Sequence, residues 1–156
     1  VEFLISKGVK RPVCFSLSPV YVSSISERIQ GYMDALEDPN QAKLVQIPHE
    51  DIEGGVRNAL EELKNEEYDG VFCVNNNVAK ALIRELSMQG ESLESVKIIS
   101  FDDIEVFDIV NPKISAIVQP INEIGKHAVN LLVDRLDNEK THIPKKVVLY
   151  TVLVER

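Results

Sequence analysis

The sequence contains no apolar run that approaches the roughly 20 residues of a membrane-spanning helix, so a protein with such a span is excluded. It is also short of basic residues, because 17 Lys and Arg stand against 25 Asp and Glu and give a net charge of −8. Binding to DNA phosphates requires clustered Lys and Arg, so this composition disfavours a DNA-binding surface built from this chain alone. Hydrophobic residues nevertheless make up 44% of the 156 positions, which excludes a disordered chain and fits one globular domain.

Cysteine is scarce, and the two that are present, Cys14 and Cys73, lie inside apolar runs. We expect both to be buried free thiols, and no Cys-x-x-Cys or His/Cys spacing predicts a zinc site. The sequence also lacks the glycine-rich nucleotide-binding loops and the Gly-x-Ser-x-Gly elbow of common enzymes, and none of its histidines stands beside a plausible nucleophile. We therefore predict a protein that is not an enzyme and that needs no cofactor and no metal.

The amino terminus lacks an initiator methionine, a basic segment and a long apolar segment. The absence of the last two argues against a secretory signal, and together with reduced cysteines it predicts a cytoplasmic location. The missing methionine indicates that the chain is processed or is a piece of a longer protein.

Short apolar runs alternate with longer amphipathic stretches along the chain. The runs are typical of buried strands, and the amphipathic stretches repeat their apolar residues at helical spacing. Alternation of this kind predicts βαβ units and an α/β fold with a doubly wound parallel sheet. Strands are expected over residues 12–17, 43–47, 70–74, 96–101, 114–118 and 146–154, and helices over residues 24–37, 51–66, 78–89 and 121–136.

Polar side chains follow the strands at the edge where such sheets bind ligands, outside the carboxyl ends of the strands. Amides and carboxylates offer paired acceptors, or an acceptor beside a donor, to vicinal hydroxyls, so the set suits a polyhydroxy ligand such as a sugar. The same residue types also favour caps and turns, so ordinary loop chemistry explains them about as well. The four places are residues 16–22 with Ser18, residues 48–49, residues 75–77, and Asp102-Asp103.

Arg28 and the Asp102-Asp103 pair each allow more than one interpretation. Arg28 lies about one turn past the first strand-end loop, where it is either a solvated helix arginine or a forked donor aimed at a ligand. The residues alone favour the solvated arginine. Asp102 and Asp103 could bind a metal or act as acid and base, but ligand hydrogen bonding or helix capping fits a lone acidic pair better.

Taken in order, five stretches resemble the effector-binding domain of transcription regulators of the lactose-repressor type (LacI/GalR), which shares the fold of periplasmic sugar-binding proteins. Each stretch is weak alone, whereas five in register along nearly the whole chain are specific. They are residues 4–11 (LISKGVKR), 28–32 (RIQGY), 68–76 (YDGVFCVNN), 98–103 (IISFDD) and 112–120 (PKISAIVQP), the last followed by Ile124-Gly125.

The resemblance implies roles for individual residues and reverses the preference given above for Arg28. Arg28, Asn75 and Asp102 match family positions that hydrogen-bond the effector. Departures from the family pattern at Asn76, at Lys80-Ala81 and at Ser100 leave the assignment intact but blur the identity of the effector. The predicted ligand-binding residues are Ser18, Arg28, Asn75, Phe101 and Asp102, and Gln119 is predicted to lie at the hinge between two lobes.

The resemblance also implies how the chain is divided. We expect a periplasmic-binding-protein-like type I fold, with one nearly complete lobe and part of the other. Residues 1–112 are expected to form the second lobe, and residues 113–156 a hinge crossover with a helix and a strand of the first lobe, returning to the second. The apolar stripe of the 121–136 helix would then lack its native sheet. No DNA-binding headpiece is expected within the chain.

The resulting hypothesis is the effector-sensing domain of a cytoplasmic transcriptional regulator. The domain would bind a sugar or similar small polar metabolite and control DNA binding by a helix-turn-helix headpiece that this chain lacks. The resemblance implies a homodimer without membrane contact, joined through residues 78–89 and 104–110, although ordinary helix packing and a solvated loop also explain these two segments. The alternative is a solute-binding protein of a sugar transport system, which requires an export signal upstream. A third possibility is an enzyme that acts on a small polar substrate at Asp102 and Asp103.

Overall fold

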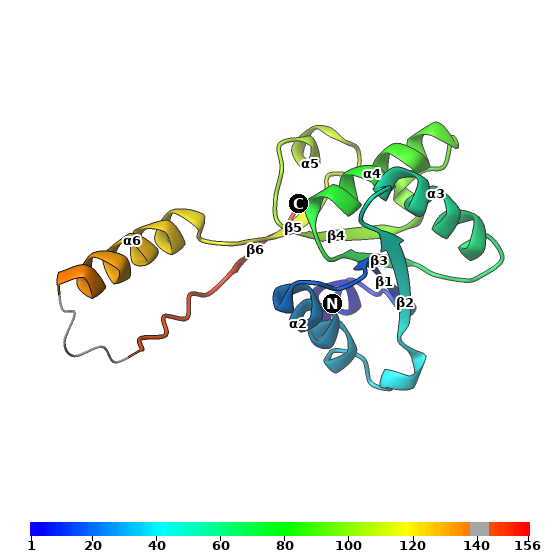
Figure 1. The fold of residues 1–156 in the computed structure, drawn as a ribbon. Helices are drawn as coiled ribbons and strands as arrows, with labels where there is room; N and C mark the ends of the chain where they lie inside the picture. The colour runs from blue at the N-terminus through cyan, green and yellow to red at the C-terminus, as the bar shows by residue number, and fades with distance from the viewer. Residues whose placement is uncertain (138–143) are drawn as a thin grey trace.

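The structure is a computed structural model that describes residues 1–137 and 144–156. Its centre is a six-stranded sheet with the strand order β2-β1-β3-β4-β5-β6 (Figure 1). The first five strands are parallel, and β6 runs antiparallel to β5. The strands are β1 (Pro12–Ser18), β2 (Lys43–Pro48), β3 (Gly70–Cys73), β4 (Lys97–Phe101), β5 (Ser115–Val118) and β6 (Val152–Val154).

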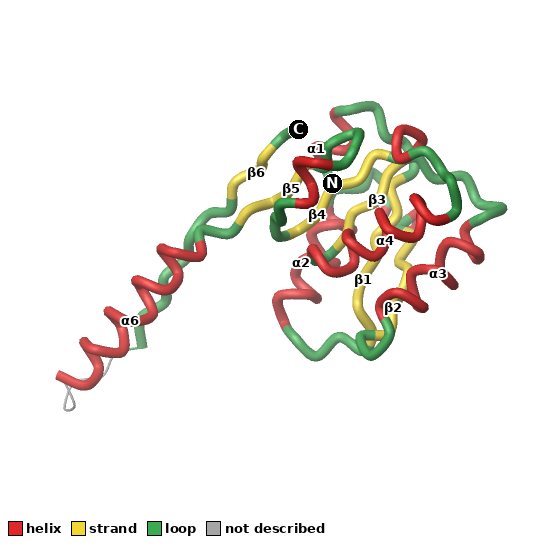
Figure 2. The backbone as a smooth tube through the Cα atoms, turned by 90° about the horizontal axis from the view of Figure 1, so that it is seen from above, coloured by secondary structure: helices red, strands yellow, loops and turns green. Residues whose placement is uncertain are grey.

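Helices cover both faces of the sheet (Figure 2). One face packs Phe15 and Val71 against α3 and α4, and the other packs Cys14 and Phe72 against α1 and α2. The doubly wound α/β fold that the sequence predicts is therefore confirmed. The helices are α1 (Glu2–Ser6), α2 (Ser23–Asp34), α3 (Ile52–Leu63), α4 (Asn76–Met88), α5 (Val106–Ile109) and α6 (Ile121–Asp137), with short 3-10 helices η1 (Pro39–Gln41) and η2 (Leu93–Ser95).

Local sequence signals account for several element boundaries. Asp51 caps α3 by accepting a hydrogen bond from the Gly54 N–H at 2.9 Å. Gly90 follows α4 with a φ of +72°, the left-handed conformation in which glycine ends helices.

The last strand is shorter than the sequence predicts, because β6 spans Val152–Val154 and residues 144–151 lie outside the regular elements. The reason lies in β5, which is only four residues long and pairs through Val118 with Val152. Beyond Val118 the chain turns into α6, so β5 offers no further backbone groups to extend the pairing.

Tyr32 is fully buried and joins α2 to the amino-terminal ends of β1 and β2. Its hydroxyl donates to the Pro12 carbonyl oxygen at 2.9 Å and accepts from the Lys43 N–H at 2.9 Å. Burial raises the pKa of this hydroxyl, so it remains a donor at neutral pH. Since Arg28 lies one turn earlier on the same helix, Tyr32 helps to fix the element that presents a predicted site residue.

Replacement of Tyr32 by Phe is expected to lower the free energy of unfolding by about 1–3 kcal/mol, because the Pro12 and Lys43 backbone groups lose a partner. Urea denaturation followed by circular dichroism measures the loss. Tyr21→Phe is the matched control, since Tyr21 is 73% exposed and the resulting loss of stability should stay within about 0.5 kcal/mol. Equal losses in the two variants would contradict the structural role of Tyr32.

Both cysteines are buried free thiols, as the sequence predicts. Cys14 of β1 lies opposite Phe72, and Cys73 of β3 lies opposite Phe15, so the two thiols belong to the cores on opposite faces of the sheet. Burial raises the pKa of Cys14 to about 12 and that of Cys73 well above its usual value. Both therefore stay protonated at neutral pH and act as small apolar side chains.

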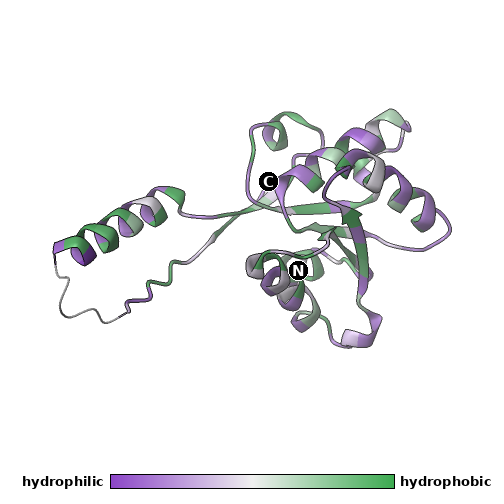
Figure 3. Ribbon diagram, in the orientation of Figure 1, coloured by the Kyte–Doolittle hydropathy of each residue, from purple (hydrophilic) through white to green (hydrophobic). Residues whose placement is uncertain are grey.

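Helix α6 stands apart from the other helices, and β5 and β6 connect it to the rest of the sheet (Figure 1). None of its residues is buried, and its apolar positions lie open to solvent, as Ile121 at 72% and Leu136 at 67% exposure illustrate (Figure 3). Within the described ranges, no helix is both long enough and apolar enough to cross a membrane.

Candidate ligand-binding site

Arg28 extends from α2 to the carboxyl ends of β3 and β4. Its Nη1 donates to the Val74 carbonyl oxygen at 2.8 Å and lies 3.7 Å from Asp102 Oδ2. Its guanidinium carbon lies 3.7 Å from the centroid of the Phe101 ring, which is a cation–π contact. The side chain is only 13% exposed, so Arg28 is not the solvated helix arginine that its sequence position alone favours.

The charge of Arg28 is compensated by its neighbours. Burial lowers the pKa of the guanidinium, and the negative charge of Asp102 opposes that change. The group still keeps its proton at neutral pH, because the ordinary pKa of arginine lies above about 12. A guanidinium has five N–H donors, and hydrogen bonds within the described chain use one of them. Donors therefore remain for a ligand.

Asp102 follows β4 directly and has a φ of +67°, in the left-handed region. This backbone conformation costs an L-residue roughly 1–2 kcal/mol, although Asp adopts it more readily than most. The Asp102 N–H donates to the Ile117 carbonyl oxygen at 2.9 Å, and its Oδ1 accepts from Gln119 Nε2 at 2.6 Å. Together with Arg28, these contacts fix the carboxylate at the edge of the sheet.

The structure thus brings together Arg28, Phe101, Asp102 and Gln119, four residues predicted from the sequence. Phe101 ends β4 and supplies the aromatic face below the guanidinium. Gln119 directly follows β5, so it links Asp102 to the point where the chain leaves the sheet for α6. A carboxylate held between the Gln119 amide and an arginine can respond to a ligand that competes for its oxygens.

Asn75 and Ser18 lie at the same edge but have other contacts. Asn75 directly follows Val74, and its Oδ1 caps α4 by accepting from the Val78 N–H at 2.9 Å. Its side-chain NH₂ group is therefore the part that can face a ligand. Ser18 ends β1, and its carbonyl oxygen accepts from the His49 N–H at 3.1 Å, which ties it to β2 rather than to Arg28.

Asp103 does not join this cluster. Its Oδ2 accepts from Arg156 Nη2 at 2.7 Å, whereas Asp102 faces Arg28 and Gln119. The two adjacent carboxylates therefore have different partners, which weighs against the acid–base or metal-binding pair considered above. In the part of the chain that the structure describes, no group of three or more His, Cys, Asp or Glu side chains is placed to hold a metal ion.

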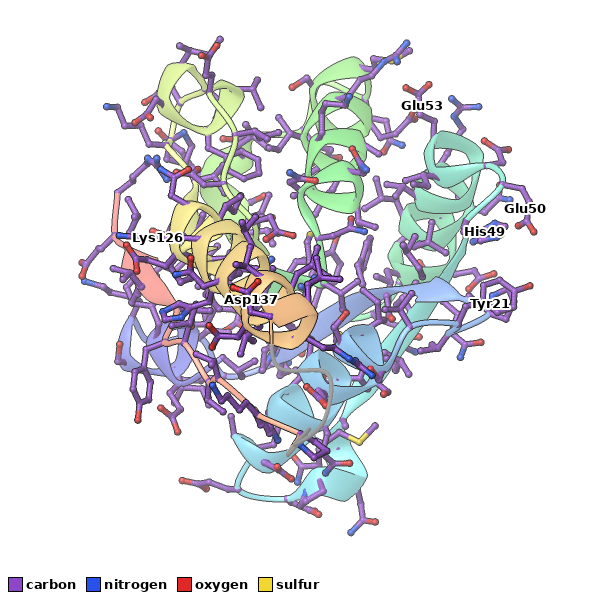
Figure 4. The ribbon with its side chains drawn as sticks, turned by 60° about the vertical axis from the view of Figure 1, so that its left-hand side comes forward. Tyr21, His49, Glu50, Glu53, Lys126 and Asp137 are labelled. Atoms are coloured by element: carbon purple, nitrogen blue, oxygen red, sulfur yellow. The ribbon has the colours of Figure 1, made fainter. Side chains whose placement is uncertain are left out.

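The sequence did not predict an aromatic pair at this edge. Tyr21, in the loop between β1 and α2, is 73% exposed, and its ring centroid lies 5.5 Å from that of His49 (Figure 4). His49 follows β2, and its Nδ1 lies 3.0 Å from Glu50 Oε2. The sequence places Tyr21 and His49 in two separate strand-end loops, and it is the pairing of β1 with β2 that brings their rings together.

The side chains around Asp102 offer groups that can hydrogen-bond a ligand. Arg28 supplies forked cationic donors, and Asp102 supplies paired acceptors. Both groups can hydrogen-bond adjacent hydroxyls, and the Phe101 ring adds an apolar group at the same place. The arrangement suits a small polyhydroxy molecule.

The sequence profile of the periplasmic binding protein-like domain family matches residues 1–156. The HTH-type transcriptional repressor PurR of Vibrio atlanticus is 29% identical over 163 aligned positions, which cover 99% of this chain and 47% of that repressor. The ribose operon repressor of Haemophilus influenzae is 33% identical over 124 positions, which cover 74% of this chain and 36% of that repressor.

Among solved structures, a LacI family transcriptional regulator from Enterococcus faecium with bound ribose has a TM-score of 0.84 and 27% sequence identity. The match covers 99% of this chain and 58% of that chain. This chain therefore spans less than half the length of the two repressors and a little more than half of the solved regulator. Those proteins contain substantial regions that have no counterpart in it.

Proposed function

Because the chain belongs to the periplasmic binding protein-like domain family, we propose that it senses a sugar or similar small polar metabolite for a transcriptional regulator. The resemblance to regulators of the lactose-repressor type is confirmed by the similar proteins described above. The observation that carries the proposal is the contact of Arg28 with Phe101 and Asp102 at the ligand edge of the sheet.

In the proposed site, ligand hydroxyls take up the free hydrogen-bonding capacity at the sheet edge. Arg28 donates through its unused N–H groups, Asn75 donates through its NH₂ group, and Asp102 accepts. Ser18 and the Tyr21–His49 pair form the wall on the side of β1 and β2. Ribose is the first candidate, because the similar regulator from Enterococcus faecium carries it.

The hydrogen bond from Gln119 to Asp102 suggests how binding reaches the rest of the regulator. A ligand hydroxyl that donates to Asp102 Oδ1 competes with Gln119 Nε2 for the same oxygen. Gln119 stands where the chain leaves the sheet, so a change in its contact acts on the connection to the other lobe. Ligand binding at Asp102 and the relative orientation of the two lobes are then linked equilibria, so each changes the other.

The exposed face of α6 supports the proposed division into lobes. We propose that residues 1–112 form the second lobe and that residues 113–156 form the crossover with a helix and a strand of the first lobe. Helix α6 and the segment that precedes β6 carry exposed large apolar residues, including Leu132 at 58%, Val148 at 67% and Tyr150 at 88% exposure. An apolar surface of that extent is stable in water only when another element covers it, which the remainder of the first lobe provides.

The functional unit is proposed to be a homodimer joined through α4 and the 104–110 segment. Two large apolar side chains stand exposed there, Met88 at 66% and Ile109 at 81%. Exposed apolar residues at the centre of a patch contribute most to stable association between protein surfaces.

Ile109→Glu is therefore expected to weaken the dimer of the full-length protein by at least about tenfold, because a charge enters the apolar contact. Light scattering during size-exclusion chromatography over a concentration series measures this. Ile5→Glu serves as the control, since Ile5 is also exposed, at 40%, but lies on α1. Dimers of unchanged stability in the Ile109 variant would show that α5 is not at the interface.

The proposed role includes no catalytic step and no cofactor. We assign DNA contact to a headpiece outside this chain, because the chain itself has a net charge of −8 and is unsuited to phosphate binding. A regulator of this kind acts where the chromosome is, so we propose a cytoplasmic location and no membrane contact.

Calorimetric titration of the full-length protein with D-ribose and a panel of other sugars tests the function. We expect one sugar to bind without being consumed and to change the affinity of the protein for DNA selected from a random library. If no sugar or related metabolite binds, the proposal fails. If the protein binds a sugar but is found outside the cytoplasm and selects no DNA, the transport alternative replaces it.

A further inference from the structure

Arg156 lies just after β6 and holds several segments together. Its Nη2 donates to Asp103 Oδ2 at 2.7 Å, and its Nε donates to Asp108 Oδ1 at 2.9 Å. Nη1 donates to the Ile114 carbonyl oxygen at 3.1 Å, and the Arg156 N–H donates to Ser115 Oγ at 3.0 Å. The side chain is only 10% exposed, so these contacts are largely protected from solvent.

The two acidic partners of Arg156 stand at the two ends of the segment that follows the proposed ligand site. Asp103 is the residue after Asp102, and Asp108 lies in α5. Among the described residues, Asp103 Oδ1 is buried without a hydrogen-bond partner. The Asp103 side chain is 25% exposed, but a carboxylate oxygen that is buried without a partner is still unfavourable unless a compensating charge lies beside it. The guanidinium of Arg156 supplies that charge to Asp103.

Asp102 has a particular need for such support. Its φ of +67° is unfavourable for an L-residue, and a conformation of this kind persists only when surrounding contacts determine it. On one side Asp102 is held by Ile117 and Gln119. On the other side the chain continues into Asp103, whose carboxylate pairs with Arg156, and then to Phe107, which is buried in the core.

We propose that Arg156 is a positioning residue for the sugar site: it makes no contact with the sugar and acts through the residues that it holds. By holding Asp103 and Asp108, it keeps the 102–108 segment in the conformation that presents the Asp102 carboxylate to Arg28 and to the ligand. This inference rests on the proposed function of the site. The inference makes the site depend on Arg156, which follows β6. Ligand affinity is then coupled to the position of the chain after β6.

The test compares Arg156→Gln, Arg156→Lys and the unsubstituted full-length protein. The first measurement is amide hydrogen exchange of the peptide that contains residues 102–108, without ligand. The second is the calorimetric dissociation constant for D-ribose. We expect at least about tenfold faster exchange and about tenfold weaker binding in Arg156→Gln, because hydrogen bonds to charged partners are lost. Arg156→Lys, which keeps the charge but not the fork, should recover part of both.

Arg57→Gln is the matched control. Arg57 donates through Nε and Nη2 to the two carboxylate oxygens of Glu85, both at 3.0 Å, and so joins α3 to α4 through an arginine–carboxylate pair of similar geometry. The Arg57→Gln substitution should destabilise the protein without selectively speeding amide hydrogen exchange over residues 102–108. A merely structural Arg156 would behave in the same way as this control.

The outcomes separate the two proposals. Unchanged exchange over residues 102–108 in Arg156→Gln overturns the inference, whether or not the protein binds sugar. Faster exchange with unchanged D-ribose affinity also overturns it, because the loop would then not position the site. If the unsubstituted protein binds no sugar but exchange rises as expected, the proposed function fails and the support of Asp102 by Arg156 stands.

Discussion

Arg28→Ala is expected to weaken sugar binding by at least about 100-fold, the largest loss of affinity from any single change in this chain. The substitution removes the only cation at the ligand edge that contacts both Phe101 and Asp102 in the described structure. Hydrogen bonds from a charged group contribute roughly 1.5–3 kcal/mol each, and 1.4 kcal/mol is about tenfold in affinity. A ligand that uses two of the free guanidinium donors therefore accounts for the expected effect.

The fold should survive this change. Arg28 makes one backbone hydrogen bond, to Val74, and the Asp102 carboxylate left behind is 28% exposed and can be solvated, so the net loss of stability is modest. Arg28→Lys should bind almost as weakly as the Ala variant, because an ammonium cannot reproduce the planar fork. Calorimetric titration with the sugar identified in the panel measures the affinities, and circular dichroism checks the fold.

Arg11→Ala provides the control for removing an arginine in general. Arg11 precedes β1 at the opposite edge of the sheet, pairs with Glu67 and is 55% exposed. Its removal should leave the affinity for sugar unchanged. If Arg28→Ala binds sugar as tightly as Arg11→Ala does, the site assignment is wrong even if the protein is a sugar sensor.

The framework that carries Arg28 could be predicted because its signals are local. A run such as Val71-Phe72-Cys73 is apolar throughout, as expected for a strand covered on both faces, and it forms β3. Asn75 then supplies a capping side chain at the start of α4, and the structure confirms that cap. Placing the polar strand ends at one edge requires only the rule that parallel strands end together.

The parts that could not be predicted depend on contacts between distant segments. Ser100, two residues earlier, donates from its Oγ to the Asp102 carbonyl oxygen at 3.2 Å, but the other groups that hold the left-handed backbone of Asp102 come from the distant Ile117 and Gln119. The salt bridge of Asp103 likewise depends on Arg156, which the antiparallel pairing of β6 with β5 brings into place. Helix α5 has four residues, too few for an apolar period to appear.

Asp102→Ala and Asp102→Gly are expected to agree in function and to differ in stability. Both remove the carboxylate that lies between Arg28 and Gln119, so both should weaken sugar binding by about 30-fold or more, the value of one or two charge-assisted hydrogen bonds. Both should also abolish the response of DNA binding to sugar in the full-length protein. Retained affinity in the pair would remove Asp102 from the site.

The stabilities of the two variants report on the backbone. At a φ of +67°, alanine keeps the steric conflict of its Cβ whereas glycine has none. Part of that advantage is offset by the greater freedom of glycine in the unfolded chain, so the Gly variant should be more stable by about 1 kcal/mol. Asn58, exposed in the middle of α3, is the matched control, since there glycine should be less stable than alanine by about 1 kcal/mol. Urea denaturation of the four variants measures both stability differences between Ala and Gly. The proposed left-handed backbone at position 102 requires Gly to be the more stable variant there and Ala to be the more stable variant at position 58.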